Sequence, residues 1–246
     1  MNAEPVNYQV DGCAMRSQLF IHGSGAGPRP GLLVFPEAFG LGAHALQRAE
    51  RLAALGYAVL ACDIHGDAAV HDDFETVIAL IGGLRSDPKR IAARAAAGLE
   101  ALAGRPEVDP TCIAAIGYCF GGTMALELAR AGGAVAAVVG FHSGLAPAGP
   151  NAAPGFSAKV LVCLGSDDPS IDRAQRTAFE DEMRAAGADW QINLYGGVVH
   201  SFTNPDADAR GNTDFARYDA KADAGSWAAM LQFLDASFAH RNADPA

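Results

Sequence analysis

One cysteine lies in a pattern that can present a nucleophile. Residues 117–121 read GYCFG, which is the pattern G-x-S-x-G with Cys119 where serine usually stands. In such an elbow a strand turns sharply into a helix, so the central side chain points out at the carboxyl edge of the sheet. The helix N-terminus also favours a thiolate. We therefore predict that Cys119 is a nucleophile. The alternative is a buried structural cysteine, because free cysteine is among the most buried residue types.

A thiol nucleophile needs a base, and the base needs an orienting carboxylate. Asp168 and His200 follow Cys119 in the chain order that accompanies this elbow, each just after an expected strand. Because the carboxyl ends of parallel strands meet at one edge of a sheet, we expect the three side chains to converge. Asp167 competes for the acid role, but we expect it to cap the following turn. The alternative for His200 is a solvent-exposed loop histidine.

The remaining histidines and cysteines indicate neither a metal site nor a cofactor. No histidine pair has i, i+4 spacing with a partner carboxylate on one helix, so we expect no metal. The five cysteines are odd in number and include no CxxC, which argues against a disulfide or zinc framework and favours a reducing cytoplasm. His65 and His142 each follow an expected strand, and we expect both to line the cleft.

The bulk composition excludes some classes of partner. The net charge is −10 and no basic cluster is present, which argues against nucleic acid and anionic membrane surfaces. The longest apolar stretches, such as residues 134–139, are too short to span a bilayer, and the first residues lack the pattern of a signal peptide. We therefore expect a cytoplasmic protein whose partner is a small molecule.

Strand and helix patterns alternate along the chain. Continuous apolar runs and helical periodicity predict strands at 6–10, 16–22, 31–35, 57–63, 112–117, 135–140, 159–165 and 190–195, and helices at 44–55, 73–84, 88–103, 121–131, 173–186 and 226–240. This alternation predicts an α/β fold, with a single mostly parallel sheet and helices on both faces. We expect one domain over residues 1–246, with a surface loop at 145–157. The polar stretch 204–225 is an insertion that we expect to be a solvated loop, with a lid or a subunit contact as alternatives.

Four motifs together carry a resemblance to a known family. They are FPEAFG at 35–40, GYCFGG at 117–122, GSDD at 165–168 and HSF at 200–202. With these motifs the chain resembles the dienelactone hydrolase family, which has the α/β-hydrolase fold. The resemblance implies a triad of Cys119, His200 and Asp168 that cleaves a carboxylic ester or lactone through an acyl-thioenzyme.

The resemblance also implies roles for residues around the triad. Glu37 is expected to contact the resting thiol and to take part in forming the thiolate when substrate binds. A helix-start carboxylate is the alternative for this residue. Two backbone N–H groups are expected to form the oxyanion hole, and five side chains are expected to contact the substrate. These sets are the N–H groups of Phe120 and Ala38, and the side chains of His65, His142, Phe39, Phe202 and Asn204.

This chain departs from the family where lactone-specific members bind a substrate carboxylate with arginines. Residues 63–74 and 203–206 contain no arginine, and the spacing of Arg85 and Arg210 does not place either in the cleft. We therefore expect the substrate to be a neutral ester, or a small lactone with a different anchor group. We expect the protein to be a monomer or a homodimer. Two other functions remain as alternatives: a redox-sensing or ligand-binding module built on Cys119, and an amidotransferase-like enzyme. The latter fits poorly because no His-x-Glu pair is present at His200.

Overall fold

The computed structural model describes residues 2–23, 27–147 and 156–243 of the chain. Its strands in this part are β1 (Asn2–Val10), β2 (Cys13–Ile21), β3 (Arg29–Phe35), β4 (Ala58–Ala61), β5 (Val108–Tyr118), β6 (Ala137–Phe141), β7 (Lys159–Gly165) and β8 (Trp190–Tyr195). Its helices are α1 (Ala43–Ala54), α2 (Phe74–Arg85), α3 (Pro88–Ala103), α4 (Phe120–Arg130), α5 (Arg173–Ala185), the short η1 (Asp208–Arg210) and α6 (Ala220–Ala243).

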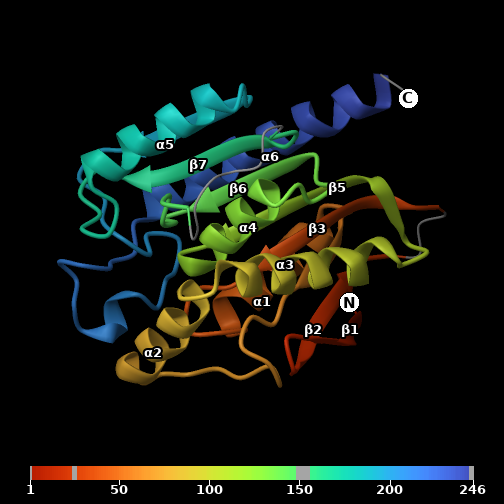
Figure 1. The fold of residues 1–246 in the computed structure, drawn as a ribbon, viewed down its shortest axis with the longest axis horizontal. Coiled ribbons are helices and arrows are strands. Elements are labelled where there is room, and N and C mark those ends of the chain that lie inside the picture. The colour runs from red at the N-terminus through yellow and green to blue at the C-terminus, as the bar shows by residue number, and fades with distance from the viewer. Residues whose placement is uncertain (1, 24–26, 148–155, 244–246) are drawn as a thin grey trace.

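These strands form one sheet in the order β1-β2-β4-β3-β5-β6-β7-β8 (Figure 1). β2 is antiparallel to β1 and to β4, whereas every other neighbouring pair is parallel. The predicted α/β-hydrolase fold with a mostly parallel sheet is therefore confirmed. The carboxyl ends of β3, β5, β6, β7 and β8 meet at one edge of the sheet, which is where the predicted site residues follow their strands.

Helices cover both faces of the sheet, so its central strands are buried on both sides. Along β3, Leu33 packs into the core beneath α3 and α4, while its neighbour Leu32 packs into the core beneath α1 and α6. In Figure 1, α3 and α4 lie in front of the strands and α6 runs behind them. The two cores hold the sheet between two helical layers and so fix the carboxyl edge rigidly.

β1 and β5 each begin four residues before the expected strand, and two further elements differ from the expectation for local reasons. β4 ends at Ala61, two residues early, because the Asp63 carboxylate accepts N–H groups of the following turn, among them those of Gly66 and Ala68. α6 begins at Ala220 and not at 226, because Asp219 caps it by accepting the N–H of Ala222 at 2.8 Å. Up to residue 219 the polar stretch 204–225 is mostly exposed and irregular apart from the short η1, as expected of a solvated loop, whereas its last residues form the start of α6.

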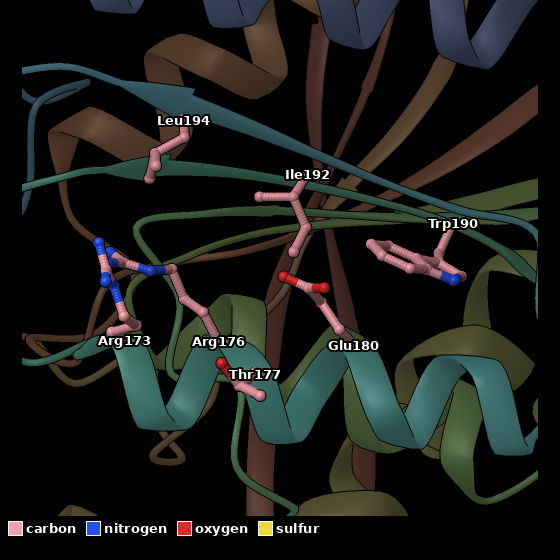
Figure 2. Close-up of a pocket in the computed structure, with 7 residues that line it drawn as sticks. All are labelled: Arg173, Arg176, Thr177, Glu180, Trp190, Ile192 and Leu194. Carbon is pink, nitrogen blue, oxygen red and sulfur yellow. The ribbon is translucent and has the colours of Figure 1, made fainter.

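Part of one expected loop lies outside the described residues, since residues 148–155 of the stretch 145–157 are not described. At the edge of the sheet formed by β8, this strand and α5 border a groove of about 480 Å³ (Figure 2). It is lined by Arg173, Arg176, Thr177, Glu180, Trp190, Ile192 and Leu194. None of the predicted catalytic side chains lines this groove.

Candidate active site

The turn between β5 and α4 has the backbone geometry of a nucleophile elbow. Cys119 lies there with φ 54° and ψ −119°, a conformation that side-chain-bearing residues rarely adopt. A Cβ atom at Gly117 would lie 2.0 Å from the Gly121 carbonyl oxygen, and one at Gly121 would lie 2.3 Å from that of Phe35. Only glycine fits at both positions, so the two glycines of the motif allow the close approach of β3, β5 and α4. The Cys119 side chain is half-buried at the edge of the sheet.

Asp168 and His200 meet behind this elbow. The Nδ1 atom of His200 lies 2.7 Å from Oδ2 of Asp168, and both side chains are buried. Asp167, the competing acid, is exposed and accepts a hydrogen bond from Ser166 Oγ at 2.6 Å. The backbone of His200 is held on both sides: its N–H donates to the Phe215 carbonyl at 3.1 Å, and its carbonyl accepts from the segment that follows. The stretch 204–225 therefore helps to place the histidine.

The second nitrogen of the His200 ring serves Cys119. A hydrogen bond joins the two side chains, and the charge of the Cys119 sulfur favours a protonated ring. Burial by itself lowers the pKa of His200, but Cys119 and the Asp168 carboxylate outweigh it and raise that pKa to about 10. The arrangement thus places the Cys119 sulfur beside a ring whose other nitrogen is held by Asp168.

Glu37 is buried and accepts three hydrogen bonds. Ser201 Oγ donates to its Oε1 at 2.7 Å, while Asn204 Nδ2 and Arg210 Nη2 donate to its Oε2 at 2.6 and 2.8 Å. Burial disfavours its charged form, yet the neighbouring His44 and Arg210 keep the pKa of Glu37 below its usual value. These partners hold the carboxylate against the loop that carries His200. The expected contact between Glu37 and the resting thiol is not among these hydrogen bonds, so that part of its role stays a prediction.

Sequence reasoning did not place Arg210, which the structure brings to the site. Its guanidinium carbon lies 4.1 Å from the centre of the Phe39 ring, and a third of its side chain is exposed. It comes from the one-turn helix η1, whose position follows from tertiary packing and leaves no spacing signal in the chain. Arg85, also unplaced by the sequence, lies with its guanidinium carbon 5.8 Å from the ring centre of Phe120, next to the nucleophile.

The two expected oxyanion-hole residues lie on either side of the elbow. Phe120 is the first residue of α4, and no carbonyl within its own helix can accept the N–H of a first residue. Ala38 lies in the turn after β3, and its carbonyl accepts from Nε2 of His65 at 2.8 Å. Burial lowers the pKa of His65, so a neutral ring donates this bond. His65 therefore braces the turn that carries Ala38.

Three of the residues expected to contact substrate lie behind the triad. His142 and Phe202 have no exposed surface, and Asn204 is only 3% exposed. The His142 ring packs edge-on against that of His200, with 5.1 Å between ring centres. With this burial the three side chains offer little or no surface to a substrate, so we assign them to support of the triad. Phe39 and His65 are half-buried and remain candidates for contact.

The described residues contain neither a candidate metal site nor a candidate membrane-spanning helix. No group of three or more histidine, cysteine or acidic side chains in residues 2–23, 27–147 and 156–243 is placed to hold a metal ion. Over the same stretches, no helix combines the length and apolar character that crossing a membrane requires.

Known proteins resemble this chain over nearly its whole length. Residues 18–238 match the model of the dienelactone hydrolase family. The solved structure of a dienelactone hydrolase-like promiscuous phosphotriesterase, P91, from metagenomic libraries is 44% identical, with a TM-score of 0.92 over 96% of this chain and 98% of that one. A Bradyrhizobium protein named "Probable 2-oxo-3-(5-oxofuran-2-ylidene)propanoate lactonase" is 27% identical over 72% of this chain and 74% of its own. An Escherichia coli K12 relative, provisionally named a carboxymethylenebutenolidase, is 27% identical over 85% of this chain and 77% of its own.

Proposed function

The chain belongs to the dienelactone hydrolase family of ester and lactone hydrolases, and we propose that it works through a Cys119–His200–Asp168 triad and an acyl-thioenzyme. The observation that carries this proposal is the hydrogen bond of 2.7 Å between His200 Nδ1 and Asp168, on a ring that also interacts with Cys119 at the elbow. The family match leaves no reason to keep the redox-module or amidotransferase alternatives.

In the first half of the reaction, the Cys119 thiolate attacks the carbonyl carbon of the ester or lactone. The electron pair of the C=O bond moves to oxygen, and the N–H groups of Phe120 and Ala38 would stabilise this oxyanion. As the tetrahedral intermediate collapses, the C–O bond to the leaving group breaks and His200 donates its proton to that oxygen. Attack removes the negative charge on the sulfur that raises the pKa of His200, so the ring gives up its proton more readily at this step.

Acylation itself prepares His200 for the second half. Its pKa is high largely because of the negative charge on Cys119, and a thioester carries no such charge. Having given its proton to the leaving group, the ring is neutral in the acyl-enzyme and can accept a proton from water. The resulting hydroxide attacks the thioester carbonyl, the C–S bond breaks, and the thiolate and imidazolium form again. One residue thus serves as acid and then as base.

The substrate class follows from what surrounds Cys119. Arg210 is one-third exposed and supplies a cation where the sequence indicated none, although Glu37 already neutralises it. A substrate carboxylate that reached Arg210 would compete with Glu37 for the same guanidinium. We therefore propose that lactones bearing a carboxylate are substrates alongside neutral esters. This widens the expectation drawn from the sequence.

A panel of short p-nitrophenyl esters and of lactones with and without a carboxylate tests the proposal. We expect Cys119→Ala to lower kcat/KM by roughly 10³-fold or more, because removing a triad nucleophile abolishes the covalent route. Cys13→Ala is the matched control, since Cys13 is the other half-buried thiol, and it should retain full activity. Undiminished hydrolysis by Cys119→Ala would remove the triad from the mechanism.

A second activity is favoured by the 44% identity to a promiscuous phosphotriesterase. The same thiolate would attack phosphorus in a neutral phosphotriester and the P–O bond to the aryloxide would break, after which water would cleave the P–S bond and release the dialkyl phosphate. An aryl dialkyl phosphate therefore belongs in the panel. Its hydrolysis should be slower than that of the best ester and should depend on Cys119 in the same way.

A further inference from the structure

A buried ion pair behind the triad is attached to the loop that carries His200. Arg48 of α1 and Asp223 of α6 have side chains only 8% and 13% exposed, and Arg48 Nη2 lies 2.8 Å from Asp223 Oδ1. The same Nη2 donates to the backbone carbonyl of Thr203 at 2.5 Å. Thr203 is the third residue after His200. One guanidinium thus joins two helices to the segment that carries the catalytic base.

Building on the proposed triad, we propose that Arg48 is a positioning residue: paired with Asp223, it holds the Thr203 carbonyl and thereby sets the orientation of His200.

The loop between His200 and Thr203 transmits this restraint. It spans only two residues, and Ser201 has the strained φ of 51° while its hydroxyl is bound to Glu37. The Thr203 hydroxyl lies 2.8 Å from His142 Nε2, and the His142 ring packs against that of His200. A displaced Thr203 would therefore shift His200 through both the main chain and the ring contact. Catalysis is sensitive to such shifts, because a misplacement of about 1 Å can cost on the order of 100-fold in rate.

Arg48 also bears on which imidazole carries the proton. His44 lies with Nε2 3.1 Å from the Thr203 carbonyl. Burial chiefly, and the positive charge of Arg48 in addition, lower the pKa of both His44 and His142. Their surroundings thus favour the neutral form of both rings, whereas Cys119 and Asp168 favour the charged form of His200. A buried cation at this point thus suits a site that needs its proton beside Cys119.

The test uses variants that separate positioning from stability. In Arg48→Met/Asp223→Leu both charges disappear and the volume is kept, a replacement that buried pairs often tolerate without loss of stability. Arg130→Met is the control, because Arg130 is equally buried, pairs with Glu182 and binds the Leu145 carbonyl at 2.7 Å. The readouts are the melting temperature, kcat and KM on the best ester, and the iodoacetamide alkylation rate of Cys119 in a Cys13→Ala background.

We expect the double variant to fold, to lose roughly 10- to 100-fold in kcat with little change in KM, and to alkylate more slowly. Arg48→Lys, which keeps the charge on a shorter donor, should fall between it and the wild type. Arg130→Met should keep its kcat below its own melting temperature. Wild-type kcat and alkylation in the double variant would overturn the proposal, as would an equal loss of kcat in Arg130→Met.

If the double variant fails to fold, Arg48→Lys decides: reduced kcat in a folded protein supports the proposal, and an unchanged kcat overturns it. The alkylation rate needs no turnover. If the wild type hydrolyses nothing in the panel, the proposed function fails, but slower alkylation in the Arg48 variants still supports the positioning role.

Discussion

Three histidines lie around the same buried region, and their surroundings give them different charges. His142 and His44 are desolvated without a carboxylate bonded directly to either ring, so burial lowers the pKa of both. His200 is just as buried, but Asp168 on one nitrogen and Cys119 on the other reverse the effect. The chemistry at the residue scale therefore depends on which ring lies between a carboxylate and the cysteine sulfur.

This difference predicts a titration that can be measured for a single residue. In the wild type, the NMR resonances of the His200 ring should titrate near pH 10. In Cys119→Ala the largest cause of the rise is removed, so the pKa of His200 should fall by several units, held up only by Asp168. Cys13→Ala should leave it unchanged. A pKa of His200 near 6.5 in the wild type would contradict the thiolate–imidazolium pair.

The convergence of the three residues of the proposed triad could be foreseen at the residue scale, but the contacts that support them could not. Cys119, Asp168 and His200 follow strands whose carboxyl ends must meet, so the topology of the sheet brings them together. Arg210 and Arg48 reach the site from η1 and from the middle of α1. Their contacts depend on how distant segments pack, and a single sequence carries no periodic signal for that.

At the scale of elements, most helices and strands were predicted within a few residues. Strong apolar runs, and glycines at the ends of helices, made the elements around the sheet predictable. The glycines of the elbow also have a structural reason, because β3 and α4 approach each other closely there. Residues 204–225 form mostly the exposed loop that their polar composition favoured up to residue 219. Their contacts could not be predicted: the stretch binds the His200 backbone through Phe215 and caps α6 with Asp219.

Across the whole molecule, the same histidines should shape stability against pH. His44 and His142 have folded pKa values below the unfolded value of 6.5, so their contribution is complete above pH 6.5 and is lost as the pH falls. His200 has a raised pKa, so its contribution is complete below pH 6.5 and is lost as the pH rises through about 10. Each group contributes a slope of up to about 1.4 kcal/mol per pH unit.

The free energy of unfolding, measured by urea titration at a series of pH values, should therefore decline in both directions from near-neutral pH. His142→Gln can keep the hydrogen bond to Thr203 and should make the acid limb shallower. Cys119→Ala should make the alkaline limb shallower. Limbs of unchanged slope in both variants would mean that other groups control the stability.

The covalent intermediate on Cys119 is the claim on which the mechanism rests, and acid-quenched mass spectrometry during turnover of a p-nitrophenyl ester tests it most directly. We predict an added acyl mass on the peptide that contains Cys119, formed at the rate of the p-nitrophenol burst and absent from Cys119→Ala. Turnover with no acyl group on that peptide, or with the acyl group on another residue, would contradict the account.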